Sequence, residues 1–246
     1  SFFGAELSKP KTVNGYNFYA PTLNINKEKK LVKNGYEFLW DIKNILLEFG
    51  VKTTSIVKVD GLSSNKTIGL RFQIKSNMEN LLIFYSKVGF ECNRNAMKLS
   101  NLAYAYLRYK EKIVSLRKKT RHLVRELYKS GVARSAFLAK YSKPDDFVDS
   151  SFILHSIYSD GRENPRISFN FPSFKEFVEK HSFGDYGLII DEVESLEKKE
   201  YKGYVYDITI KDGEHNFIAD NFVVSNCGVR LCSTALNKDD LLGKER

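Results

Sequence analysis

The chain has 246 residues, with 39 Lys and Arg against 30 Asp and Glu, and a formal net charge of +9 at pH 7. Hydrophobic residues make up 42% and aromatic residues 13% of the chain, so a packed core can form and wholesale disorder is excluded. No run approaches the roughly 18 apolar residues that a transmembrane helix needs, and three cysteines are too few for a disulfide framework. We therefore expect one or two domains in the reducing cytoplasm, without a membrane partner.

Basic and acidic residues are segregated along the chain. Residues 94–143 hold 14 Lys and Arg against 2 Asp and Glu, a net charge of +12. Residues 183–226 hold 4 Lys and Arg against 10 Asp and Glu, a net charge of −6. A concentrated basic segment is typical of a surface that binds phosphates, and the alternative is a solvated helix face without a ligand.

The first part of the chain predicts five elements in the order strand, helix, strand, strand, helix. They are expected at residues 16–26, 36–49, 53–59, 68–74 and 78–87. Gly50 and Gly89 stand where helices commonly end. The apolar positions of the first helix are Phe38, Leu39, Ile42, Ile45, Leu46 and Phe49. This order predicts an α+β unit with an antiparallel sheet.

A long helix is predicted over residues 99–129 and a short one over residues 136–141, with Gly131 between them. This is the outline of a helix-turn-helix motif, and the alternative is a helical spacer with a basic outer face. Residues 143–182 contain several prolines and predict irregular structure. The candidates for phosphate contacts are Arg117, Lys118, Lys119, Arg121 and Arg125. The tyrosines of this region are expected to pack inside the protein rather than to stack on bases.

The last part of the chain predicts short β-strands that precede an Asn-Cys pair. The strands are expected at residues 188–190, 203–210, 216–219 and 222–224. An Asn amide nitrogen can attack its own carbonyl carbon, which forms a succinimide and cuts the following peptide bond. A neighbouring His can act as general acid or base, and a Cys thiolate can accept an acyl group. Asn226, Cys227 and His215 therefore predict acyl transfer followed by Asn cyclisation.

Residues 183–227 resemble the C-terminal splicing region of an intein of the Hint fold. In that family a Tyr-Asp strand and a His-Asn-Phe turn precede a terminal Asn and a nucleophile, and the same order occurs here. The resemblance implies that Asn226 cyclises and that Cys227 accepts the acyl group. It also implies that Asp207 tunes the nucleophile and that His215 assists cyclisation, without a cofactor.

One position departs from the intein pattern. The family usually has His before the terminal Asn, whereas this chain has Ser225. A hydroxyl is a poor general acid at neutral pH. We therefore expect His215 or a bound water to carry more of the proton transfer, and C-terminal cleavage to be slow.

Residues 1–98 resemble the second half of a LAGLIDADG homing endonuclease, in which a short motif helix leads into a sheet and helices. Residues 2–7 are similar to the end of the motif helix, although two positions depart from the pattern. The resemblance implies that Glu6 helps to hold Mg²⁺ for DNA cleavage and that Lys75 faces the phosphate. Because one half supplies only part of the metal site, we expect the chain alone to be inactive as a nuclease.

The five residues from Cys227 to Leu231 resemble a segment of RtcB-type RNA ligases that begins with a metal-binding Cys. The resemblance implies that Cys227 binds Mn²⁺ in an enzyme that joins RNA ends with GTP. Residues 227–246 would then be the start of the host protein.

Together these patterns predict an α+β protein in four parts. A LAGLIDADG-like mixed αβ half-domain is followed by a basic helical region, the all-β C-terminal part of a Hint fold and an RtcB-like extension. The expected ranges are 1–98, 99–182, 183–226 and 227–246.

Three functions remain open at this point. The first is the C-terminal portion of an intein precursor, made of splicing and endonuclease regions. Its partners would be DNA, at an intein-less host gene, and a missing N-terminal intein portion with its N-extein. The second is part of an RtcB-type tRNA-splicing ligase that uses GTP and Mn²⁺. The third is a basic DNA-binding module with an inert terminal motif.

Overall fold

The computed structural model describes most of the first 190 residues and a smaller part of the rest. The described residues are 2–60, 67–158, 165–184, 187–190, 193, 195–204, 206, 208, 216–219 and 222–225. The chain divides into two compact units, residues 1–192 and 193–246. In the described part of the chain, no helix is long and apolar enough to cross a membrane.

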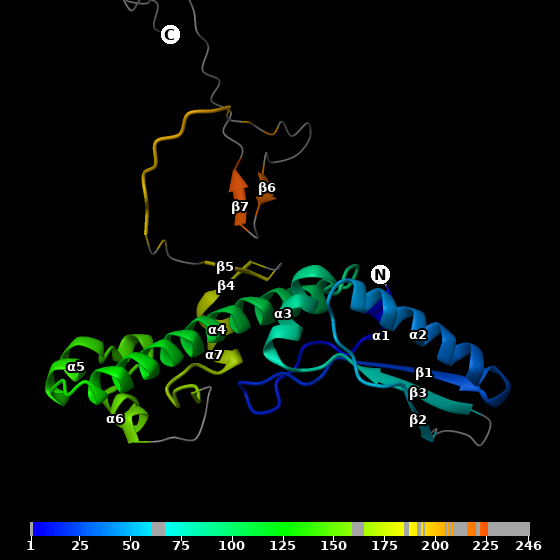
Figure 1. Cartoon of the computed structure of the whole chain (residues 1–246). Helices are drawn as coiled ribbons and strands as arrows, with labels where there is room; N and C mark the ends of the chain where they lie inside the picture. The colour runs from blue at the N-terminus through cyan, green and yellow to red at the C-terminus, as the bar shows by residue number, and fades with distance from the viewer. Residues whose placement is uncertain are drawn as a thin grey trace, which may run out of the picture. The chain divides into compact units, whose positions relative to one another are not determined.

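The first unit contains a three-stranded antiparallel sheet in the order β1-β3-β2 (Figure 1). Its strands are β1 (Thr22–Glu28), β2 (Val57–Asp60) and β3 (Thr67–Gln73). The register pairs Leu23 with Phe72 and Ile25 with Leu70, so apolar side chains gather on one face of the sheet. All three predicted strands are confirmed, but two are shorter than expected.

The first strand starts later than predicted because a turn precedes it. The side-chain oxygen of Asn14 accepts hydrogen bonds from the backbone N–H groups of Tyr16 and Asn17, at 3.2 and 3.1 Å. An Asn side chain that bonds the backbone two residues ahead is typical of a turn. Residues 16–21 therefore lead into the strand instead of belonging to it.

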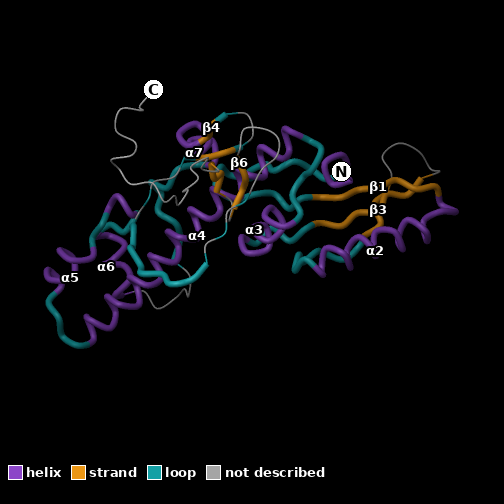
Figure 2. Tube along the Cα trace, turned by 90° about the horizontal axis from the view of Figure 1, so that it is seen from above, coloured by secondary structure: helices purple, strands orange, loops and turns teal. Residues whose placement is uncertain are grey.

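Helix α2 lies against the apolar face of this sheet (Figure 2). The nearby helical elements are α1 (Phe2–Glu6), the 3₁₀ helix η1 (Lys29–Leu31), α2 (Val32–Glu48) and α3 (Met78–Lys87). At Gly35 a Cβ would meet the Lys27 Cγ at 2.8 Å and the Leu70 Cδ1 at 3.0 Å, so the helix comes close to the sheet there. The predicted helices over residues 36–49 and 78–87 are confirmed, and α2 starts one turn earlier than expected.

Helix α4 (Arg94–Lys129) connects the two ends of the first unit (Figure 1). Its 36 residues correspond to a length of about 54 Å. It starts five residues before the predicted helix because the Asn93 side chain accepts a hydrogen bond from the Ala96 N–H at 3.1 Å. It ends before Gly131, whose φ of +81° is the left-handed conformation expected there.

Helices also form in residues 143–182, where irregular structure was predicted. The helices after α4 are α5 (Arg134–Tyr141), the 3₁₀ helix η2 (Pro144–Asp146), α6 (Ser150–Tyr158) and α7 (Phe174–His181). The prolines do not prevent α6 and α7, since they lie outside both helices. Residue Asp149 accepts a hydrogen bond from the Phe152 N–H at 2.7 Å and so caps the start of α6.

Two hydrophobic cores lie along α4. The larger core joins the sheet with α2, α3, α7 and the first half of α4. The smaller core joins the second half of α4 with α5 and α6, and its buried residues are Val124, Phe137, Val148, Phe152 and Ile153. A short antiparallel pair, β4 (Ser182–Phe183) and β5 (Leu188–Ile189), completes the first unit.

In the second unit, β6 (Asn216–Ala219) pairs antiparallel with β7 (Phe222–Ser225). The two predicted strands at these positions are confirmed. Within the predicted strand at 203–210, the described residues 203, 204, 206 and 208 belong to no strand, and the others lie outside the described residues. The LAGLIDADG-like and Hint assignments, with their four ranges, stay predictions.

Candidate nucleic-acid interface

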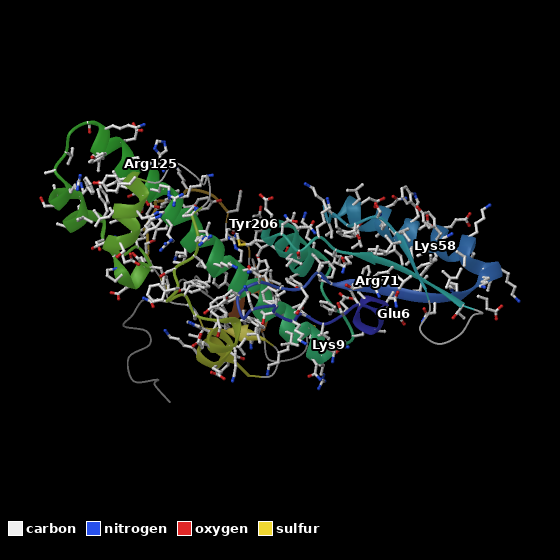
Figure 3. All side chains as sticks on the ribbon, turned by 90° about the horizontal axis from the view of Figure 1, so that it is seen from below. Glu6, Lys9, Lys58, Arg71, Arg125 and Tyr206 are labelled. Carbon is white, nitrogen blue, oxygen red and sulfur yellow. The ribbon has the colours of Figure 1, made fainter. Side chains whose placement is uncertain are left out.

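One side of the second half of α4 carries basic side chains at helical spacing. We define the basic face of α4 by Lys118, Lys119, His122, Arg125 and Lys129. At 3.6 residues per turn, these positions lie opposite the buried Ile113 and Val124. Arg125 is half-buried and the other four side chains are exposed. Figure 3 marks Arg125 near the α5–α6 end of the helix.

Arg117 and Arg121, which were expected to contact phosphates, point into the protein instead. Only 6% of Arg117 and 9% of Arg121 is exposed. The Arg117 side chain donates a hydrogen bond to the Phe147 carbonyl, and its guanidinium carbon lies 3.9 Å from the centre of the Phe152 ring. Burial lowers the pKa of Arg117; nearby Asp149 raises it and Arg121 lowers it further. These two arginines therefore connect helices and do not reach a ligand in this conformation.

Other basic residues of the 94–143 segment also make internal contacts. The Lys110 ammonium donates to the Tyr16 carbonyl and to the Asn17 side chain, both at 2.8 Å. Arg125 donates through Nε to the Ser156 carbonyl at 2.6 Å. Part of the net charge of +12 therefore stabilises the fold, and in the basic face of α4 it is Lys118, Lys119 and Lys129 that are exposed cations.

The tyrosines of α4 were expected to pack inside the protein, and three of the four do, namely Tyr104, Tyr106 and Tyr109. Tyr106 is buried and donates a hydrogen bond from its hydroxyl to the Pro172 carbonyl at 3.0 Å. Tyr109 stacks on Phe171 with 5.3 Å between ring centres. Tyr128 is exposed instead, and its ring centre lies 6.0 Å from that of Tyr158.

The two residues proposed for an endonuclease site are exposed, and they do not make up a complete set of metal ligands. Glu6 ends α1, and Lys75 follows β3. Within the described residues, no group of three His, Cys, Asp or Glu side chains could hold a metal ion. A single exposed carboxylate does not fit Mg²⁺, which needs several oxygen ligands in octahedral geometry.

The residues proposed for peptide chemistry are mostly not described. Asn226, Cys227, His215 and Asp207 lie outside the described residues. Ser225 ends β7, where its backbone is in register with Asn216. The roles assigned to these residues, including Mn²⁺ binding by Cys227, stay predictions.

An exposed aromatic pair on α2, Tyr36 and Trp40, was not predicted from the sequence. Periodicity also placed Phe38, Ile45 and Phe49 in the core, yet all three are exposed. The core contacts of α2 come from Leu39, Ile42 and Leu46. The sequence does indicate that some apolar side chains of α2 must be exposed, because the helix has more apolar residues than one face can bury.

Comparisons with known proteins show similarity to segments of two differently named proteins. The chain is 33% identical over 246 residues to the tRNA-splicing ligase RtcB of Methanocaldococcus jannaschii, covering 98% of this chain and 24% of that protein. It is 36% identical over 222 residues to the RtcB of Pyrococcus furiosus, covering 89% and 22%. The chain thus spans about a quarter of the length of these curated relatives.

The second name belongs to a polymerase. The chain is 25% identical over 229 residues to the DNA-directed RNA polymerase subunit Rpo1N of Methanocaldococcus jannaschii, covering 92% of this chain and 13% of that protein. No protein-family model matches the chain, and no solved structure matches it.

These comparisons correct the identification made from the sequence. Similarity to RtcB-type ligases was expected only for residues 227–246, with an intein portion before them. The similarity to the RtcB polypeptides instead runs through 98% of the chain, and this finding overturns the intein identification. The partners inferred from that identification, DNA and a missing N-terminal portion with its N-extein, are given up with it.

Proposed function

We propose that the chain is a segment of an RtcB-type tRNA-splicing ligase polypeptide and that this segment binds RNA through the basic face of α4. The observation that carries the proposal is the set of exposed cationic side chains along one side of the helix, at Lys118, Lys119 and Lys129, with the half-buried Arg125 next to them. Lys and Arg side chains neutralise phosphates and release counterions, which gives affinity without reading sequence.

The names of the relatives support RNA as the ligand. One relative is a tRNA-splicing ligase and the other is a subunit of an RNA polymerase, so both are named for work that involves RNA. A segment that resembles parts of both is expected to contribute something that both need. Contact with the RNA backbone meets that requirement, whereas the ligation reaction does not.

Ligation belongs to the longer polypeptide in this proposal. Mn²⁺ and GTP, which the RtcB resemblance implies, would supply a metal centre and the energy for joining RNA ends. The described residues hold no cluster of metal ligands, and Cys227 lies outside them. We therefore assign no step of the ligation reaction to the residues described here.

The test is RNA binding by the full chain and by the variant K118A/K119A. We expect the double substitution to weaken binding about tenfold at low salt, because two phosphate contacts are lost. The slope of log K against log salt concentration should fall by about 1.4 for single-stranded RNA. Fluorescence anisotropy of a labelled oligonucleotide measures both quantities.

The matched control is K175A/K180A, which removes two exposed lysines from α7. This variant has the same net charge as K118A/K119A and should bind RNA with nearly unchanged affinity. An equal loss in the two variants would show that net charge alone matters and would contradict the proposed site. Absence of RNA binding at low salt would contradict the function itself.

A further inference from the structure

Two aromatic side chains stand one helical turn apart on the outer surface of α2. Tyr36 is 42% exposed and Trp40 is 50% exposed. Their rings are nearly parallel, with 13° between the planes and 6.4 Å between the centres. Exposed apolar side chains are common on α2, but two flat parallel rings side by side can stack on other planar groups.

The pair does not belong to the core. The contact of α2 with the sheet is made by Leu39, Ile42 and Leu46, with the close approach at Gly35. Tyr36 and Trp40 lie on a neighbouring side of the helix. Their function is therefore separable from folding, and substitutions there are expected to preserve the fold.

A lysine lies close to the tryptophan ring. The Lys43 ammonium donates a hydrogen bond to the Thr54 carbonyl at 2.7 Å and lies 5.5 Å from the centre of the Trp40 ring. A cation over an aromatic face is attracted by the ring electrons. The indole thus has a cation on one side that is itself bonded to the segment after α2.

Two lysines of α2, Lys33 and Lys43, lie within one turn of the pair. Lys33 is exposed one turn before Tyr36, and η1 precedes it with Lys29 and with Lys30, whose ammonium lies 3.1 Å from the Glu28 carboxylate. The acidic residues of α2 are Glu37, Asp41 and Glu48, and Glu37 lies one turn before Trp40 at the edge of the stripe that contains the rings. Aromatic rings beside cations match a ligand that has planar apolar groups joined by phosphates.

We propose that Tyr36 and Trp40 form a stacking platform for unpaired bases of single-stranded RNA. The platform would be a second RNA contact in addition to the basic face of α4. It therefore rests on the proposed function for the choice of RNA as the ligand. Bases stack on aromatic side chains without regard to sequence, while the nearby lysines attract the backbone.

Trp40 makes a direct test possible because it is the only tryptophan in the chain. The full chain is titrated with a single-stranded 12-mer of adenylate, a blunt RNA duplex of the same length and inorganic polyphosphate. We expect saturable quenching of tryptophan fluorescence by the single strand, much weaker quenching by the duplex and none by polyphosphate.

Variants then separate the two rings from general charge. The substitution Tyr36→Ala should weaken the quenching titration about tenfold, as expected for loss of one stacking partner. The matched control Phe38→Ala removes an exposed aromatic side chain from the other flank of α2 and should leave the titration unchanged. If circular dichroism shows that Y36A is misfolded, Y36L keeps an apolar side chain there without a planar ring.

Several results would overturn the platform. Unchanged fluorescence while anisotropy shows bound RNA, or equal quenching by polyphosphate, would exclude base stacking at Trp40. A shift of the emission with protein concentration alone would indicate a second copy of the chain on this surface. A different result would contradict the α4 site: K118A/K119A would bind RNA with normal affinity, and RNA would still quench Trp40 fluorescence.

Discussion

A single residue shows why basic character in the sequence does not locate a binding surface. Arg117 and Lys118 are neighbours in the same helix, yet the first is buried and the second is exposed. The 100° step between successive residues turns one side chain toward Phe152 and the next toward solvent. The sequence contains the charge, but the register of α4 against its second core decides where the charge is presented.

Replacing Arg117 is expected to affect stability and not RNA binding. In R117M the Phe147 carbonyl loses its charged donor and Phe152 loses its cation, so unfolding should become easier by about 2–3 kcal/mol. Urea denaturation measures the stability, and anisotropy should show RNA affinity within about twofold of the unchanged chain. The neighbouring substitution K118M is the control and should show the opposite pattern. Loss of RNA affinity by a stable R117M would return Arg117 to the binding site.

At the scale of elements, helix α7 was not predicted, although Ser173 and Glu176 have the spacing of a helix start. The Ser173 hydroxyl accepts from the Glu176 N–H at 3.3 Å, and the Glu176 carboxylate accepts from the Ser173 N–H at 2.7 Å. This reciprocal pair is the capping box that Ser-x-x-Glu predicts. Pro172 stands just before this cap, and the prolines of residues 143–182 predicted irregular structure there. In contrast, α3 was predicted with its observed bounds, because its periodic apolar residues and Gly89 both indicate the same end of the helix.

The capping box predicts a pH dependence of stability. Hydrogen bonds from Ser173 lower the pKa of Glu176 below its ordinary value of 4.5. The folded state therefore favours the charged carboxylate, and the stabilisation is present above the ordinary pKa of Glu. It is lost as the pH falls through the lowered value. The difference in melting temperature between the chain and E176A should be present at pH 6 and vanish near pH 3.

The variant S173A tests the same element at neutral pH. Removing the cap should cost about 1 kcal/mol, as for other helix N-caps. Ser115→Ala, at an exposed position in the middle of α4, is the control and should have little effect. The loss of melting temperature caused by E176A should become independent of pH when Ser173 is already replaced by Ala. If the loss still varied with pH in the same way, Glu176 would act through another partner.

At the scale of the whole first unit, α4 belongs to two hydrophobic cores. Its first half packs with the sheet, α3 and α7, and its second half packs with α5 and α6. The sequence predicted the long helix but not this division, because periodicity shows that a side of a helix is apolar and not which partners cover it. The same reason explains α2, where the sequence did not show which of its apolar side chains the sheet would cover.

The two cores should respond separately to truncation. Ile153 is fully buried in the smaller core, so I153A should cost about 2–4 kcal/mol. Hydrogen exchange should rise in α5 and α6 and stay unchanged in β1 and β3. Leu39→Ala, at an equally buried position in the larger core, should give the reverse. Uniform loss of protection in both variants would show that the first unit unfolds as one cooperative body.

The continuity of α4 also sets a length scale for its ligand. From Lys118 to Lys129 the helix advances eleven residues, which corresponds to about 16 Å. Phosphates on one strand of B-form DNA advance by about 3.4 Å per nucleotide along the axis, and we take this spacing as the scale for an RNA strand. The basic face of α4 therefore matches a footprint of about five nucleotides. Shorter oligonucleotides leave some of its cations without a phosphate, and longer ones gain no further contact from this helix.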